Sequence, residues 1–304
     1  MPPASGSPLE MPTHVRVVLT LGILSFCFSP ILVRYASEAP ALAVAVWRTL
    51  FAVLFLLPFL RTAHLKRYAR LSAAEYGRIT AAGILLGVHF YLFFESLYNT
   101  TVASTTMFVA LSPVFMAAIG FVVLKERLTP AVLAGIAIAT LGGAMIAMGD
   151  ATTGSAPNPA WGNLLGVAAS FALSIYLVIG RVARQGMDWL TYVFPLYALC
   201  ALTVLALALA AGVTLTGYPP KIYGISALLA LGPQILGHGS FNLSVRYLSA
   251  AVLGLLSLTE PVGASALAWL LFDETPAAVS IAGMVVALAG VGLALAPGLF
   301  RKTR

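Results

Sequence analysis

Two groups of polar side chains lie inside long apolar stretches of this sequence and could bind a polar molecule there. Within each group the spacing is that of one face of an α-helix, so its side chains point the same way. Such a face can line a polar cavity between helices, or it can serve only for hydrogen bonds between helices. The first group is Tyr91, Glu95 and Tyr98, and the second is Gln234, His238 and Asn242.

Arg48 is a charged residue within the apolar stretch 41–60. A charge inside a bilayer is unfavourable by ~2.5–3.5 kcal/mol or more, so it needs a partner, a cavity or a route to the surface. Three interpretations are open. The side chain could extend toward the outer surface, pair with Glu95, or bind the carboxylate of a substrate. His89 lies off the face of Tyr91 and is interpreted as a packed, hydrogen-bonded histidine.

Glu260 lies near the centre of another apolar stretch, and it too has two interpretations. As a scaffold, a protonated Glu260 would donate a hydrogen bond to a neighbouring helix, for example to a carbonyl freed by Pro261. As a coupling residue, it would lose and regain a proton as a cavity opens to each side. Intramembrane acids are functional by default, but of the two interpretations the scaffold is favoured for Glu260. Glu95 is the better candidate for substrate contact.

The composition places these residues in a membrane. The chain of 304 residues is 60% hydrophobic and 9% charged, whereas soluble domains carry about 25% charged residues. Each of ten apolar segments is near the ~20 residues that cross a bilayer. Most of the cations other than Arg48 lie between these segments or near their ends, so the net charge of +7 does not indicate nucleic-acid binding. The segments are 15–35, 41–60, 73–96, 102–124, 131–148, 161–181, 189–212, 222–243, 250–272 and 277–298.

The sequence contains an internal repeat, with two similar segments one after the other. At an offset of 148 positions Pro113 falls on Pro261, Glu126 on Glu274 and Gly142 on Gly290. Each proline is expected to break its helix. The glycines, with the Gly83 and Gly87 pair, indicate close helix packing. The first helices also match, through Ser25 and Ser29 in one copy and Ser170 and Ser174 in the other. These serines either allow close approach or line a pseudo-symmetric cavity.

A repeat unit of five helices has a consequence for topology, because an odd number makes the second copy enter the membrane from the opposite side. The predicted fold is therefore an all-α polytopic membrane protein with ten transmembrane helices as two inverted five-helix repeats. Most Lys and Arg residues fall in loops on one side, which the positive-inside rule assigns to the cytoplasm together with both termini. The predicted parts are a disordered tail 1–13, a first repeat 14–149, a periplasmic linker 150–160, a second repeat 161–298 and a cytoplasmic tail 299–304.

The duplicated motifs resemble those of the drug/metabolite transporter superfamily, EamA type. They are Ser112-Pro113-Val114 with the run from Lys125 to Pro130, and Glu260-Pro261-Val262 with the run from Asp273 to Pro276. The helix around Arg48 is similar to an apolar family helix with a single Arg. The resemblance implies a central substrate cavity and small-molecule transport, more often export than uptake.

The expected function is secondary transport of a small metabolite, for example an amino acid or similar zwitterion, across a bacterial inner membrane by alternating access. The alternatives are an integral membrane enzyme and a non-transporting sensor or assembly subunit. Motifs of hydrolases, zinc proteases and phosphate-binding loops are absent from the sequence, so no catalytic residue, metal or cofactor is assigned. The expected partners are a small-molecule substrate and the lipid bilayer. Proton coupling stays open, as does the choice between monomer and homodimer.

Overall fold

The computed structural model describes residues 11–124, 130–153, 156–244, 247–248 and 256–300, and within these ranges it contains helices and no strand. Five of these helices are long and apolar enough to cross a membrane, and shorter apolar helices accompany them. The five are α1 (Thr13–Tyr35), α2 (Ala41–Leu56, extended by the 3-10 turn Leu57–Phe59), α4 (Ala73–Asn99), α8 (Pro159–Ala183) and α9 (Trp189–Ala210).

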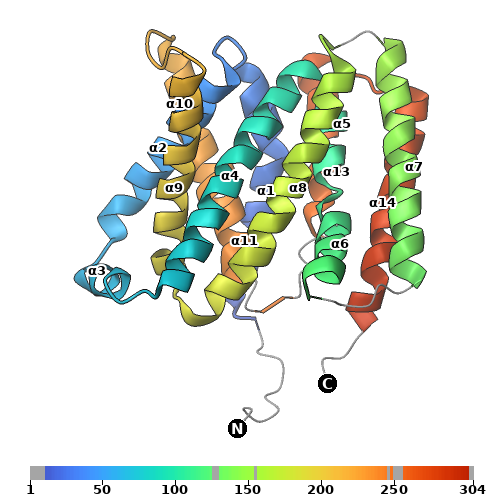
Figure 1. Cartoon of the computed structure of the whole chain (residues 1–304). Coiled ribbons are helices and arrows are strands. Elements are labelled where there is room, and N and C mark those ends of the chain that lie inside the picture. Colours follow the sequence, from blue (N-terminus) through green and yellow to red (C-terminus); the bar gives the residue numbers. More distant parts are fainter. Residues whose placement is uncertain (1–10, 125–129, 154–155, 245–246, 249–255, 301–304) are drawn as a thin grey trace.

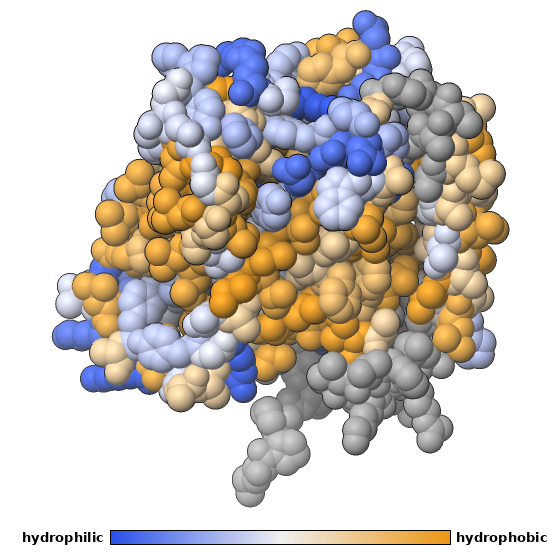
Figure 2. Space-filling model, turned by 45° about the horizontal axis from the view of Figure 1, so that its top comes forward, coloured by the Kyte–Doolittle hydropathy of each residue, from blue (hydrophilic) through white to orange (hydrophobic). Residues whose placement is uncertain are grey.

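The remaining helices complete one bundle (Figure 1). They are α3 (Thr62–Tyr68), α5 (Val102–Val109), α6 (Ser112–Leu124), α7 (Pro130–Thr153), α10 (Pro220–Leu229), the π-helix η3 (Ala230–His238), α11 (Gly239–Ser244), α13 (Thr259–Phe272) and α14 (Ala278–Phe300). The beginning of α1, the end of α14 and α3 lie at the same end of the bundle (Figure 1). Figure 2 shows apolar side chains across the middle of one face and hydrophilic ones toward its upper end and lower left. An all-helical protein with this surface suits a bilayer, in which helices satisfy their own backbone groups.

Side-chain caps set where several helices begin. Ser72 accepts a hydrogen bond from the amide of Glu75 at 3.3 Å, and the Glu75 carboxylate accepts one from the amide of Ser72 at 2.7 Å, which closes a capping box at α4. Thr101 and Asn158 accept from the amides of Ser104 and Trp161 at the starts of α5 and α8. Each cap satisfies an amide that has no partner within its helix.

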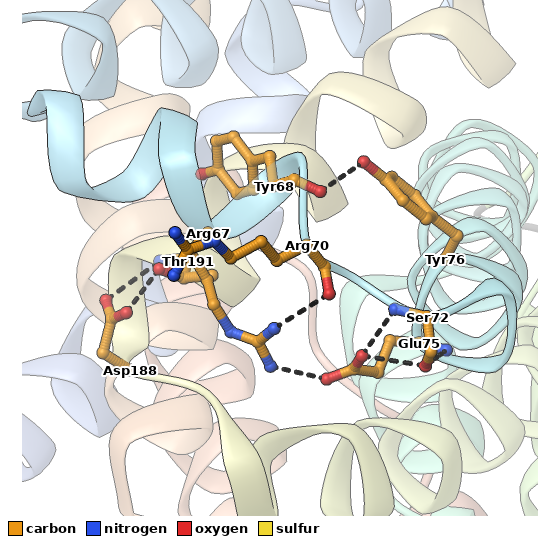
Figure 3. A network of polar contacts seen from close by, with 8 residues as sticks. All are labelled: Arg67, Tyr68, Arg70, Ser72, Glu75, Tyr76, Asp188 and Thr191. Atoms are coloured by element: carbon orange, nitrogen blue, oxygen red, sulfur yellow. Dashed lines mark hydrogen bonds and ion pairs between the residues drawn. The ribbon is translucent and has the colours of Figure 1, made fainter.

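The corner between α3, α4 and α9 is held by polar contacts (Figure 3). Arg67 of α3 forms an ion pair with Glu75 at 2.7 Å, and Tyr76 donates to the carbonyl of Tyr68 at 2.6 Å. On α9, Asp188 accepts from the amide and the hydroxyl of Thr191. Burial alone would raise the pKa of the Asp188 carboxyl, but these hydrogen bonds outweigh it and leave the pKa below its usual value. The hydroxyl of Tyr68 donates to the carbonyl of Leu190 at 3.5 Å and so links α3 to the start of α9.

Helix α4 packs between α8 and α9 through small residues. A Cβ atom on Gly83 would lie 2.6 Å from Cβ of Leu199, and one on Gly87 would lie 2.9 Å from Cβ of Thr203, so only glycine allows this approach to α9. On its other side, Ser96 donates to the carbonyl of Gly162 on α8 at 2.7 Å. Because α4 precedes and α8 and α9 follow the predicted linker, the core lies between the two sequence copies.

Helices α7 and α14 form a second close and antiparallel contact, at the side of the bundle (Figure 1). A Cβ on Gly142 would lie 2.6 Å from the carbonyl oxygen of Gly283, and one on Gly290 would lie 2.7 Å from the carbonyl oxygen of Gly135. Farther along, Gly149 of α7 faces Ser280 of α14. The duplicated glycines thus pair across the two copies, and the backbones touch.

The apolar stretch 102–124 is interrupted at Ala110 and Leu111, between α5 and α6. Pro113 lies in the first turn of α6 and has no N–H to donate to the carbonyl of Val109. Similarly, α13 begins at Thr259 after a turn at Leu258, and Pro261 lies in its first turn. Residues 249–255, which precede this second break, and Glu126 of the repeated acidic turn lie outside the described residues.

Candidate functional site

Arg48 lies in the interior of the bundle, where 1% of its side chain is exposed. Its Nε donates to Oε1 of Gln234 at 3.1 Å. The guanidinium carbon is 3.8 Å from the ring centroid of Phe90 and 5.3 Å from that of Phe94, both on α4. The face of an aromatic ring attracts a cation, so burying a guanidinium against it costs less free energy than burying it against an aliphatic side chain. Arg48 therefore does not extend to the surface, and in the described part of the chain it forms no ion pair with Glu95.

Gln234 comes from the π-helix η3, a rare geometry that often accompanies functional sites. Pro233 lies within η3 and cannot donate to the carbonyl of Leu229, which disrupts the regular α-helical ladder. The hydroxyl of Tyr197 on α9 donates to the backbone carbonyl of Gln234 at 2.6 Å and holds this segment. The side-chain Nε2 of Gln234 is buried and has no hydrogen-bond partner among the described residues.

His238, also on η3, lies in a layer of rings. Its ring centroid is 5.1 Å from that of Phe26, 5.2 Å from that of Phe90 and 5.9 Å from that of His89, mostly in edge-to-face geometry. Nδ1 of His89 is 2.9 Å from the carbonyl oxygen of Ala169, so His89 is a buried, hydrogen-bonded histidine as the sequence indicates. The His238 ring has no hydrogen bond to any described residue. The layer places one imidazole beside Phe90, the ring that covers the Arg48 guanidinium.

Asn242 extends the same group on α11. Its Nδ2 donates to the hydroxyl of Tyr176 at 2.6 Å and to the carbonyl of His238 at 2.9 Å. Its own backbone carbonyl accepts from Nε of Arg184 at 2.9 Å. The structure therefore brings Gln234, His238 and Asn242 together in one buried cluster with Arg48.

The group Tyr91, Glu95 and Tyr98 on α4 has different surroundings. The Tyr98 hydroxyl donates to the carbonyl of Ala39 at 2.9 Å, in the connection between α1 and α2. The carboxylate of Glu95 accepts from Nδ2 of Asn99 at 3.4 Å. All three side chains are partly exposed. Within the described ranges, no hydrogen bond, ion pair or ring contact links this group to the Arg48 cluster.

The serines of α8 form hydrogen bonds with the broken helix α5–α6, and not with the equivalent serines of α1. Ser170 donates to the carbonyl of Val109 at 3.0 Å, and Ser174 donates to that of Ser112 at 2.9 Å. Val109 is the residue whose helical donor Pro113 removes, so the hydroxyl of Ser170 replaces the lost N–H. On α1, Ser25 donates to Gly22 within its own helix, and Ser29 is buried. These contacts favour the packing interpretation for Ser170 and Ser174.

We predict that the double change Ser170→Ala and Ser174→Ala destabilises the protein, because two carbonyls lose their hydroxyl donors in a dry interior. The expected cost is about 1–3 kcal/mol, mainly for the Val109 carbonyl, which Pro113 leaves without a helical donor, measured as a lower melting temperature in detergent. Ser226→Ala is the matched control, since Ser226 is equally buried but donates within its own helix to Ile222. Equal melting temperatures for the double variant and the control would contradict this role.

Glu260 lies in the first turn of α13, where this helix packs against α1. The contact is tight: Sγ of Cys27 is 3.7 Å from the carbonyl oxygen of Thr259, and a Cβ on Gly263 would lie 2.5 Å from that sulfur. Glu260 is close enough for its charge to act on both Cys27 and Arg48. Its side chain is partly exposed and forms no hydrogen bond or ion pair with a described residue.

The cluster has the chemistry of a binding site. It combines a buried cation, a buried amide N–H without a partner and walls of aromatic rings. No group of three metal-ligating side chains occurs among the described residues. The arrangement can hold a polar molecule against an apolar wall, and its members come from both sequence copies: Phe26, Arg48, His89 and Phe90 from the first, and Tyr176, Tyr197, Gln234, His238 and Asn242 from the second.

Sequence reasoning did not single out Tyr176, Tyr197, Phe90 or Arg184 as members of this cluster. A signal was present for the tyrosines, because a hydroxyl deep in an apolar helix must find a partner. Both do so, Tyr176 with Asn242 and Tyr197 with Gln234. No feature of the sequence distinguishes Phe90, because phenylalanine has no polar group that requires a partner and is common in membrane helices.

Comparison with known proteins agrees with this architecture. The chain is 26% identical over 175 residues to the protein described as "Uncharacterized transporter YyaM" from Bacillus subtilis (strain 168), a match that spans 56% of this chain and 57% of that relative's length. A solved crystal structure shares the fold, with a TM-score of 0.62 at 18% identity over 96% of this chain and 100% of that one. The family model of the EamA-like transporters matches residues 16–148 and again 160–296. The chain is therefore a multi-pass membrane protein that belongs to the EamA-like transporter family.

Proposed function

We propose that this protein is a secondary transporter that moves a small metabolite across the bacterial inner membrane by alternating access, in the direction of export. The observation that carries the proposal is the buried cluster of Arg48 and Gln234, which residues of both halves build. A site between two repeats can be exposed first to one side of the membrane and then to the other. An amino acid or a similar zwitterion fits a site with Arg48 and, within electrostatic reach, Glu260.

The proposed fold is ten transmembrane helices in two inverted repeats of five. The pairing of breaks and glycines supports it: α5–α6 and the stretch ending in α13 each carry a proline in the first turn after the break. The antiparallel contact of α7 with α14 also agrees, because equivalent helices of an inverted repeat run in opposite directions. In this proposal α3, with Lys66 and Arg67, lies at the cytoplasmic end together with both termini.

Flux measured in liposomes tests the transport function. Liposomes that contain the purified protein are loaded with radiolabelled amino acids, and we expect the label to leave faster than from protein-free liposomes, with the amino acids chemically unchanged. A modified product without flux would instead favour an integral membrane enzyme. If neither flux nor a modified product were found with any of the amino acids, the proposed cargo would be rejected, and a sensor or assembly subunit would be favoured.

A further inference from the structure

Arg48 differs from the partly exposed Arg34 and from the buried Arg184 in its hydrogen-bond partners. Arg34 forms an ion pair with Glu274 at 2.9 Å and donates to the carbonyl of Thr100 at 2.7 Å. Arg184 donates to the backbone carbonyls of Asn242 and Met187. Arg48 donates through Nε to a neutral amide, and no carboxylate of the described residues lies within ion-pair distance of it. Arg48 is therefore a buried cation without a bound anion.

Gln234 supplies a second and independent indication of a missing acceptor. Its Oε1 is used by Arg48, while its Nε2 is buried and unpartnered. Gln234 has 0% of its side chain exposed, so water does not satisfy this N–H from outside. A buried donor without an acceptor costs about 1–3 kcal/mol. The amide of Gln234, whose Nε2 lacks an acceptor, thus lies beside a guanidinium that has no carboxylate partner among the described residues.

The surroundings limit what the acceptor can be. The face of Phe90 covers the guanidinium at 3.8 Å, and Phe94 lies beyond it at 5.3 Å, so the neighbouring volume is apolar. One cation neutralises one negative charge. A phosphate with nearly two charges would leave a net negative charge in a poorly solvated site, which is unfavourable. A carboxylate carries one charge and two acceptor oxygens in one plane, and a guanidinium matches this geometry.

We propose that Arg48 and Gln234 form the site that binds the carboxylate of the transported molecule, with the apolar part of that molecule against Phe90 and Phe94. The guanidinium donates to the carboxylate from its terminal nitrogens, and Nε2 of Gln234 donates beside it. That the bound molecule is also transported rests on the proposed function. Binding at Arg48 requires only that the ligand carry a negative charge.

Four probes with one aromatic body test the site in the purified full-length protein: phenylacetate, L-phenylalanine, the neutral phenylacetamide and the cationic phenethylamine. A ligand that binds the folded state raises the melting temperature. We expect phenylacetate and phenylalanine to raise it at millimolar concentration, and the amide and the amine to leave it unchanged. An equal rise with the amide, an equal rise with sodium chloride at matched ionic strength, or no rise with either carboxylate would overturn the proposal.

Gln234→Glu gives a sharper test, because it places a permanent carboxylate next to Arg48. The ligand-free variant should melt higher than the wild type, and it should show no further rise with phenylacetate. Arg34→Gln is the control: it removes a partly buried cation that already has its carboxylate, so it should lower the melting temperature but keep the preference for carboxylates over amide and amine. A Gln234→Glu protein that still responds to phenylacetate would contradict the site.

The melting experiment tests the binding site and the liposome experiment tests transport, so each proposal can be rejected without the other. If amino acids left the liposomes but the melting experiment showed no preference for carboxylates, the proposed Arg48 site would be rejected and the transport function would be retained. Selective carboxylate binding without flux of any of these probes would leave the site standing and reject the transport function.

Discussion

Replacing Glu260 with glutamine should leave the protein folded and remove the part of its transport that a proton gradient drives. Glutamine keeps the shape of the side chain but cannot exchange a proton. The scaffold interpretation requires a hydrogen bond from the carboxyl group to a neighbouring helix. No such bond to a described residue exists, and the side chain is partly exposed beside Cys27. A carboxyl group that is partly exposed, has no hydrogen bond to a described residue and lies within reach of the Arg48 charge is suited to coupling.

The measurement compares export from liposomes with and without an imposed proton gradient, for the wild type and for Glu260→Gln. We expect the variant to export at the gradient-free rate under both conditions. Glu95→Gln is the matched control, because it removes an acid from another membrane helix while its gradient dependence should persist. A Glu260→Gln protein that keeps the full pH dependence excludes coupling through this residue, and one that fails to fold restores the scaffold.

Gly290→Ala should be among the most destabilising single-methyl additions in the chain. The added Cβ would lie 2.7 Å from the carbonyl oxygen of Gly135 and would also collide with the backbone of Ala139. Backbone atoms cannot turn away as a side chain can, so α7 and α14 must separate along their length. Overpacking of this kind costs about 1–3 kcal/mol, and we expect a melting temperature several degrees lower in detergent.

Gly292→Ala is the control within the same helix, because a Cβ on Gly292 meets nothing within 4 Å. Alanine is more favourable than glycine inside a helix by about 0.5–1 kcal/mol, so this variant should melt no lower than the wild type. If the two variants melted alike, the close contact of α7 with α14 would not contribute to stability.

The sequence was sufficient for the helical class and the family, because both depend on features that repeat. Apolar segments of membrane length and the match of Pro113 with Pro261 can be read without knowing any contact. The carbonyl that Pro113 frees is equally predictable, since a proline always removes the donor of the residue four positions earlier. That Ser170 would supply the replacement depends on how α8 packs against α5, which no local pattern encodes.

The partner of Arg48 could not be predicted for a similar reason. The spacing of Gln234, His238 and Asn242 indicates one face of a regular helix, but η3 is a π-helix with more residues in each turn. The three side chains still reach one cluster, although each points differently: Gln234 to Arg48, His238 to the rings and Asn242 to Tyr176. Glu95, the obvious partner by charge, lies on α4 among groups near the α1–α2 connection instead.

The contact between α7 and α14 looks the same from either helix. Gly142 meets Gly283 and Ala287, while Gly290 meets Gly135 and Ala139, and the repeat relates each residue of one set to a residue of the other. A surface with this property needs only one sequence to make both of its sides. In the proposed inverted repeat, a chain of half this length would present this surface to a second copy of itself in the opposite orientation. Positions that depart from this symmetry, such as Glu260 opposite Ser112, are the ones at which the two sides of the repeat differ in chemistry.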